Sequence, residues 1–164
     1  MAQSSSDSAV EAITSTDLTL PVRSVLASAG AVIADWRNEV LEGGAGFIGS
    51  TYRFEGSAND RGDRVPWSLV LKVIRGDPSE APSEVGYWKR EVEAYQSGAL
   101  DELPVGVRAP CCHGCVVTDD GAWLWLEDVR DDLGPDWSLD QYGVVARHLG
   151  RGERNVSERP RTSW

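Results

Sequence analysis

A cluster of glycines at residues 43–49 contains a spacing that suits phosphate binding. Gly44, Gly46 and Gly49 form a GxGxxG motif. Glycine is required where backbone N–H groups must approach phosphate oxygens, because a Cβ atom would stand in the way. In a dinucleotide-binding fold this motif opens a helix, whereas the residues that follow it, Ser-Thr-Tyr-Arg-Phe at 50–54, are typical of a β-strand. The motif therefore predicts a phosphate-covering loop between two strands, and an ordinary glycine-rich hairpin is the alternative.

Lys72 lies in the middle of an apolar run, residues 68–74, where an interior strand would otherwise carry apolar side chains. Alternation along a strand places Val70 and Lys72 on one face and Leu71 on the other. The ammonium group is then expected to bind nucleotide phosphates in a cleft that Val70 lines. The alternative is a solvated lysine on an edge strand.

Glu91 is the carboxylate that we expect to orient Lys72. On a helix it projects about 60° from Trp88, at the margin of the predicted buried stripe. Glu84 shares that margin, but its place in the first turn favours a different role, stabilisation of the helix N-terminus through the helix dipole. We therefore assign the ion pair to Glu91.

These residues need a sheet and a helix to position them, and hydrophobic periodicity predicts both. Strands are expected where β-branched and aromatic residues are bounded by turn formers, at residues 31–41, 50–56, 65–74, 112–118 and 123–129. The turns between them are expected at 57–63 and 119–121. Helices are expected at 17–29 with Pro21 in the first turn, at 84–98 with Ser83 as N-cap, and at 138–150 with a Ser138 and Gln141 capping box.

This order of elements predicts an α+β fold, with a five-stranded antiparallel sheet, one packed helix and a further C-terminal helix. The first part, 1–16, is small and polar and is expected to be a disordered lead-in. Residues 17–130 are expected to form the domain, 131–150 a linker and the last helix, and 151–164 a disordered Arg-rich tail.

Composition narrows the classes of function. Sixteen basic residues against 26 acidic ones give a formal net charge of −10, which argues against nucleic-acid binding because phosphate backbones need a positive surface. An acidic surface also suits a cationic substrate. No apolar run is long enough to span a membrane and no secretory signal is evident, so we expect a cytoplasmic protein. The three cysteines lie within residues 111–115, too close to staple a fold, and are expected to be reduced.

The order of the motifs resembles the N-terminal lobe of the aminoglycoside phosphotransferase and choline kinase-like family, which has a protein kinase-like fold. The resemblance covers roughly residues 19–150. It rests on the successive segments GGAGFIGSTYRF, WSLVLKVIR, YWKREVEAY, VRAPCCHGC, WLWLEDV and ARHLG.

The resemblance implies ATP- and magnesium-dependent transfer of the γ-phosphoryl group to a small-molecule hydroxyl. It implies that Gly44, Gly46 and Gly49 cover the phosphates, that Lys72 binds them and that Glu91 orients Lys72. The apolar strand that turns acidic at Glu127, Asp128 and Val129 would be the link to a second lobe, with backbone groups facing adenine. Taken alone, this last segment fits equally well a strand that ends in a charged loop.

The catalytic part of this family is missing from the sequence. Its members carry a His-Gly-Asp-type catalytic loop and a later magnesium-binding aspartate. His148 is followed by Leu-Gly and His113 by Gly-Cys, so no such triplet occurs. We therefore expect a truncated or frameshifted phosphotransferase, with weak ATP affinity at best and no kinase activity of its own.

Two other functions compete with this hypothesis. Cys111, Cys112, His113 and Cys115 offer zinc ligands within five residues, although neighbouring strand residues point to opposite faces and no second ligand pair occurs elsewhere. Buried or half-buried free thiols are the simpler expectation. A non-catalytic protein-binding module is the other alternative, because tryptophans exposed where a second lobe would pack predict partner binding or self-association. Those tryptophans are Trp36, Trp67, Trp88, Trp123 and Trp125.

Overall fold

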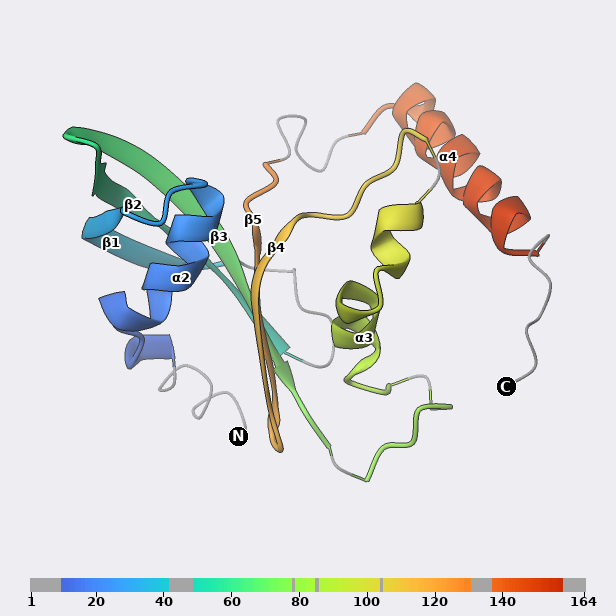
Figure 1. Cartoon of the computed structure of the whole chain (residues 1–164). Helices are drawn as coiled ribbons and strands as arrows, with labels where there is room; N and C mark the ends of the chain where they lie inside the picture. Colours follow the sequence, from blue (N-terminus) through green and yellow to red (C-terminus); the bar gives the residue numbers. More distant parts are fainter. Residues whose placement is uncertain are drawn as a thin grey trace. The chain divides into compact units, whose positions relative to one another are not determined.

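The computed structural model (Figure 1) describes residues 10–41, 49–77, 79–84, 86–103, 105–130 and 137–157. The chain divides into two compact units. The first consists of Met1–Glu93 and Pro110–Asp128, and the second of Ala94–Ala109 and Val129–Trp164. The expected domain of residues 17–130 thus contains a segment, 94–109, that groups with the second unit.

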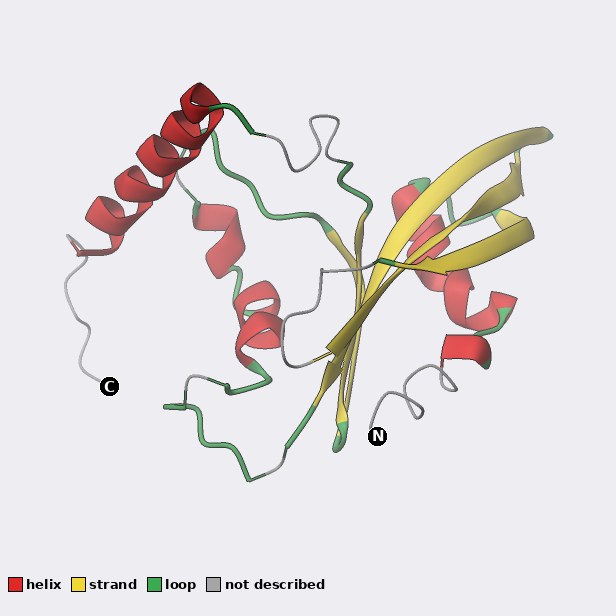
Figure 2. Cartoon of the chain, turned by 180° about the vertical axis from the view of Figure 1, so that it is seen from behind, coloured by secondary structure: helices red, strands yellow, loops and turns green. Residues whose placement is uncertain are grey.

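The first unit is built on an open antiparallel sheet of five strands (Figure 2), which confirms the predicted α+β class. Its strands are β1 (Val32–Val40), β2 (Gly49–Asp60), β3 (Asp63–Arg75), β4 (Cys112–Thr118) and β5 (Gly121–Glu127). They lie in the order β1-β2-β3-β5-β4, so β3 is central and β1 and β4 are the edges. All five predicted strands are present, and β4 has the predicted bounds.

The β2–β3 hairpin is longer than we predicted. We expected a turn over residues 57–63, but β2 and β3 stay paired to Asp60 and Asp63. Only Arg61 and Gly62 form the turn, with φ angles of 52° and 94°. Two central residues with positive φ match the right-handed twist of a two-residue hairpin, so polar residues before the turn can remain in the strands.

Helix α2 (Ser15–Val25) covers one face of the sheet and forms the main core with it. Its side chains Leu18 and Val22 are fully buried with Phe54, Leu69 and Leu71 of the sheet. Burial of a large apolar side chain stabilises the fold by about 1.5–3 kcal/mol. This face of the sheet carries the larger apolar core. The opposite face carries Lys72 together with buried apolar residues such as Ile74 and Leu124.

The helix begins earlier than we predicted. We expected a disordered lead-in through residue 16, yet Val10 is 2% and Ile13 5% exposed within the core. Thr14 is the N-cap of α2, and its backbone N–H and hydroxyl donate to Asp17 at 2.8 and 2.7 Å. These bonds lower the pKa of Asp17. Pro21 consequently lies inside the helix rather than in its first turn.

The predicted helix at 84–98 is mostly wrong. Helix α3 spans only Arg90–Gln96, and turns precede it. Gly86 weakens the expected first turns, and Gly98 adopts a left-handed φ of 74° that starts the 3-10 helix η1 (Ala99–Glu102). Ser83 is therefore no N-cap, and Glu84 lies outside the helix whose dipole it was expected to stabilise.

In the second unit, helix α4 (Leu139–Ser157) begins as predicted and ends later. The Ser138 N–H donates to Gln141 Oε1 at 2.6 Å, and the Gln141 N–H donates to Ser138 Oγ at 3.4 Å. We expected the helix to end at Gly150 and a disordered tail to follow, but residues 151–157 are helical. Arginine and glutamate are good helix formers, which offsets the glycines. The rest of the tail lies outside the described residues, among which no helix is long and apolar enough to cross a membrane.

Candidate functional site

Lys72 occupies the centre of the sheet. It lies on β3, between β2 and β5, directly opposite Thr51 on one side and Leu124 on the other. The alternative of an edge-strand lysine is therefore excluded. Its side chain is 25% exposed and lies on the face away from α2, as the predicted alternation requires. The neighbouring Leu71 points into the α2 core.

The predicted partner of Lys72 is confirmed. Lys72 Nζ donates a hydrogen bond to Glu91 Oε2 over 2.5 Å, and the two groups form an ion pair. Glu91 is the second residue of α3 and its side chain is 35% exposed. An ion pair this accessible contributes about 0–1 kcal/mol to stability. Its main consequence is geometric, because it holds the ammonium at a fixed point on the polar face.

Buried neighbours hold Glu91 in place although α3 is short. Trp88 and Val92, which flank it in sequence, are 4% and 2% exposed. A Cβ atom at Gly76 would lie 2.8 Å from the Trp88 ring, so the ring packs directly on the β3 exit. The backbone N–H of Trp88 donates to Glu80 Oε2 at 3.2 Å. The packing of Trp88 and Val92 therefore positions the Glu91 carboxylate, because a helix of seven residues is too short to do so alone.

The predicted glycine loop is only partly described. Gly44 and Gly46 lie outside the described residues, and their expected contact with phosphate stays a prediction. Gly49 is the first residue of β2, opposite Ile74. A Cβ atom there would lie 1.9 Å from the carbonyl oxygen of Val73. Close approach of two strands therefore explains this glycine without any ligand.

Val70 and Thr51 complete the surroundings of Lys72. Val70 lies two residues before Lys72 on the same face, half-buried, as predicted. Thr51 was not among the predicted site residues, yet it is only 8% exposed. Its hydroxyl oxygen is buried and has no hydrogen-bond partner among the described residues. A buried hydroxyl without a partner costs about 1–3 kcal/mol. Thr51 could be identified only from the β2–β3 register, which places it opposite Lys72.

The acidic end of β5 binds protein groups through its side chains. Glu127 Oε2 accepts a hydrogen bond from the Cys111 N–H at 3.1 Å, and the Glu127 N–H donates to the Cys111 carbonyl at 2.8 Å. Val129 is 55% exposed and belongs to the second unit. The adenine-facing role expected for this segment, which concerns its backbone, stays a prediction.

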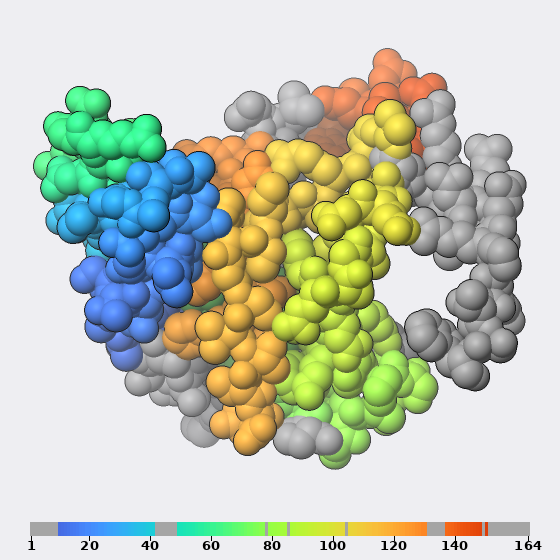
Figure 3. All heavy atoms as spheres, viewed as in Figure 1, coloured from blue at the N-terminus to red at the C-terminus, as the bar shows by residue number. Residues whose placement is uncertain are grey.

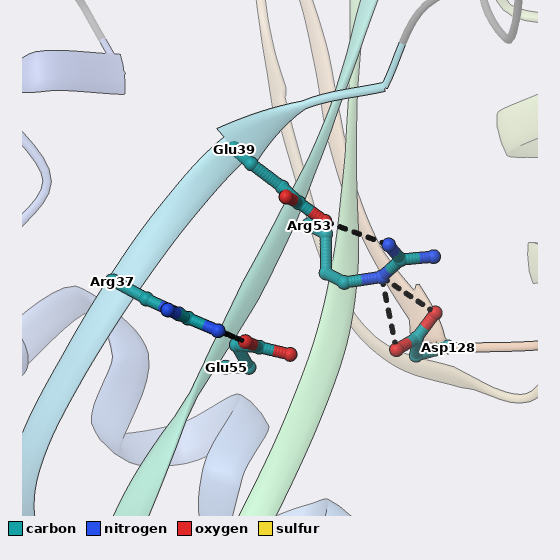
Figure 4. Close-up of polar contacts among 5 residues, drawn as sticks. All are labelled: Arg37, Glu39, Arg53, Glu55 and Asp128. Carbon is teal, nitrogen blue, oxygen red and sulfur yellow. Dashed lines mark hydrogen bonds and ion pairs between the residues drawn. The ribbon is translucent and has the colours of Figure 1, made fainter.

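Asp128 has a buried side chain, 2% exposed. Figure 4 shows Arg53 of β2 reaching it: Arg53 Nε lies 3.2 Å from both carboxylate oxygens. Arg53 Nη1 also donates to Glu39 Oε1 of β1 at 2.7 Å. The bond to Glu39, followed by the Asp128 contact, raises the pKa of Arg53. Sequence reasoning missed this arginine because its partners lie 14 and 75 residues away.

A second ion pair continues across the same two strands. Arg37 of β1 pairs with Glu55 of β2, which lies directly opposite it (Figure 4), and the hydrogen bond to Glu55 raises the pKa of Arg37. Oppositely charged side chains at facing positions stabilise a sheet by about 0.2–1 kcal/mol per pair. On the sheet face away from α2, strands β1 and β2 therefore carry paired charges, and β3 carries Lys72.

Cys112 and Cys115 lie on the edge strand β4, and Cys111 directly precedes it. Figure 3 shows β4 at the surface beside α2. Cys111 and Cys112 are exposed and Cys115 is half-buried, and none of them forms a disulfide within the described residues, so the expectation of buried or half-buried thiols is wrong for Cys111 and Cys112. A bulge between Cys112 and Gly114 brings Cys112 opposite Leu126 and Cys115 opposite Leu124, hence to one face. The adjacent residues Cys112 and His113 still point to opposite faces, as expected, because His113 Nδ1 lies 3.0 Å from Ser24 Oγ of α2 whereas Cys112 lies on the face away from α2. No three metal-ligating side chains come together in the described part of the chain.

The tryptophans do not form the exposed patch that the protein-binding alternative expected. Trp67, Trp88 and Trp125 are 4%, 4% and 3% exposed, and the remaining two are half-buried against the α2 core. Four of them, Trp36, Trp67, Trp123 and Trp125, belong to the core that α2 covers or pack against it, and Trp88 packs at Gly76 after β3. Self-association stays a prediction, but exposed tryptophans no longer support it.

Comparison of the chain with family models, curated proteins and solved structures found no match.

Proposed function

We propose that the first unit is a nucleotide-binding lobe of the aminoglycoside phosphotransferase and choline kinase-like type, and that it binds the phosphates of ATP at Lys72. The supporting observation is the ion pair between Lys72 on the central strand and Glu91 on the following helix. A lysine on β3 paired with a glutamate from the next helix is the arrangement with which kinases hold nucleotide phosphates.

The residues around this pair fit the same role. Val70 supplies an apolar wall two residues before Lys72. The glycine motif ends at Gly49, the first residue of β2, and the register of β2 places Thr51 opposite the lysine. The ion pair between Arg53 and the buried side chain of Asp128 ties β2 to the residue after β5, where the backbone would meet the adenine ring. We infer that this unit by itself binds ATP weakly, since the nucleotide cleft of a kinase lies between two lobes.

We propose that this chain by itself does not transfer the phosphoryl group. Transfer needs positioned metal ions and a base near the acceptor, and no His-Gly-Asp triplet occurs in the sequence. Magnesium accompanies ATP in the family, but the described residues bring no set of three possible ligands together, so we assign no magnesium ligands to this chain. ATP turnover that depends on an aminoglycoside or amino-alcohol acceptor would contradict this part of the proposal.

Calorimetric titration of ATP tests the binding site. Lys72→Met should weaken ATP binding about ten- to a hundredfold, because a hydrogen bond between charged groups contributes about 1.5–3 kcal/mol. Lys89→Met is the matched control: Lys89 is also a lysine of this segment, and its ammonium lies over the Trp88 ring, 5.0 Å from the centroid. Equal ATP affinity in the Lys72 variant and the control would refute the proposed site.

A further inference from the structure

Thr51 is the buried polar side chain nearest in the sheet register to Lys72. The two residues are directly opposite on β2 and β3, so their side chains lie on the same face of the sheet. Facing residues of an antiparallel pair have Cβ atoms about 4.5–5.5 Å apart. A group that binds the Lys72 ammonium from that side is therefore within reach of the Thr51 hydroxyl.

The hydroxyl lacks what a structural threonine normally has. Thr51 is 8% exposed, and its Oγ1 atom has no hydrogen-bond partner among the described residues. Buried polar atoms are nearly always hydrogen-bonded, so an exception needs an explanation. Valine has the same shape without the polar atom and would fill this position at lower cost.

Two other side-chain atoms in the described residues share this condition, Trp67 Nε1 and His148 Nδ1. Trp67 lies on the α2 face of the sheet, within the core, and His148 belongs to the second unit. Of the three, only Thr51 lies on the face that carries Lys72 and Glu91. Its missing partner is therefore best explained by the ligand of that face.

We propose that Thr51 Oγ1 donates a hydrogen bond to a phosphate oxygen of the nucleotide bound at Lys72. This inference rests on the proposed function. The ammonium of lysine has three N–H donors, of which Glu91 accepts one, so it can hold a phosphate oxygen as well. A phosphate group has several acceptor oxygens and can bind the ammonium and the hydroxyl together. The ligand thus supplies the acceptor that the protein does not.

The test measures both ATP affinity and ligand-free stability, because loss of the Thr51 hydroxyl should lower the affinity without lowering the stability. Thr51→Val should weaken ATP binding about tenfold, whereas its melting temperature without ligand should equal or exceed that of the unchanged chain. Thr51→Ser should keep the ATP affinity. Adenosine, which lacks phosphate, should bind the Thr51→Val variant as well as the unchanged chain. The matched control is Thr118→Val, whose hydroxyl donates to the Gly121 carbonyl at 3.2 Å; it should lower the melting temperature and leave ATP affinity unchanged.

Several results would overturn the inference. Unchanged ATP affinity in Thr51→Val, with a clear loss in Lys72→Met, would remove Thr51 from the site and leave the proposed function standing. An equal loss for adenosine would place the hydroxyl away from phosphate. A fall in the ligand-free melting temperature of Thr51→Val would show that the hydroxyl has a structural partner. Absence of ATP binding by the unchanged chain would refute the proposed function, and the inference with it.

Discussion

Replacing Arg53 with methionine removes the ion pair that joins β2 to the end of β5. The Asp128 side chain is 2% exposed, so its carboxylate would lose a charged partner where water reaches it poorly. Removal of one member of a buried ion pair costs about 3–5 kcal/mol. Because Arg53 itself is 21% exposed, some water can replace it, and we expect the lower end of that range, about 3 kcal/mol.

The carboxylates on either side of Arg53 provide graded controls. Asp128→Asn leaves the guanidinium paired with Glu39 at 2.7 Å, so we expect a smaller loss, about 1–2 kcal/mol. Glu39 is 60% exposed, and Glu39→Gln should cost less than about 1 kcal/mol. The expected order of stability loss is therefore Arg53→Met, then Asp128→Asn, then Glu39→Gln.

Urea unfolding followed by tryptophan fluorescence measures these differences, and thermal unfolding provides a second measurement. For a chain of this size, 1 kcal/mol corresponds to about 2–4 °C in melting temperature, so Arg53→Met should lower it by about 6–12 °C. The reasoning is refuted if Arg53→Met costs no more than Glu39→Gln, because the burial of Asp128 would then have no energetic consequence.

Three further substitutions test other parts of the fold. Gly49→Ala should lower the free energy of unfolding by about 1–3 kcal/mol, since the added Cβ would lie 1.9 Å from the carbonyl oxygen of Val73. Gly143→Ala on α4 should raise it by about 0.5–1 kcal/mol, because no atom lies within 4 Å of the added Cβ and alanine favours a helix. Equal urea midpoints for the two variants would contradict this. Burial lowers the pKa of His113 below 6.5, and the charge of Glu127 only partly offsets this. As the pH falls, the unfolded chain therefore binds the proton before the folded chain does, and the free energy of unfolding decreases below about pH 6.5. His113→Gln should flatten that decline between about pH 7 and pH 5, and an unchanged slope in pH-dependent unfolding would rule out this role.

Local pattern was sufficient to predict the sheet and the main ion pair. Alternation of apolar residues and turn formers located all five strands, because strand pairing over short turns depends on neighbouring residues. The pairing of Lys72 with Glu91 followed from the same local logic together with the family resemblance. The capping box at Ser138 likewise involves residues only three positions apart.

Local pattern failed where packing outweighed it. Residues 84–98 have apolar residues at helical spacing, but Trp88 is buried in a turn against Gly76 and only seven residues form α3. Residues 10–16 are mostly polar, yet Val10 and Ile13 complete the core under α2. In both segments a few buried contacts decide the conformation, and periodicity does not reveal which contacts will form.

The sequence by itself predicted five strands, a glycine motif between the first two and a lysine within the third, since each of these features depends on residues close together along the chain. Only the tertiary structure decided that Arg53 reaches Asp128, that Thr51 faces Lys72, and that a bulge brings Cys112 and Cys115 to one face. These relations depend on strand register, which a shift of one residue would reverse. The two-residue turn at Arg61 and Gly62 sets the register of the β2–β3 hairpin, whereas pairing between segments distant in sequence sets the register of β5 on β3. The sequence pattern specified neither.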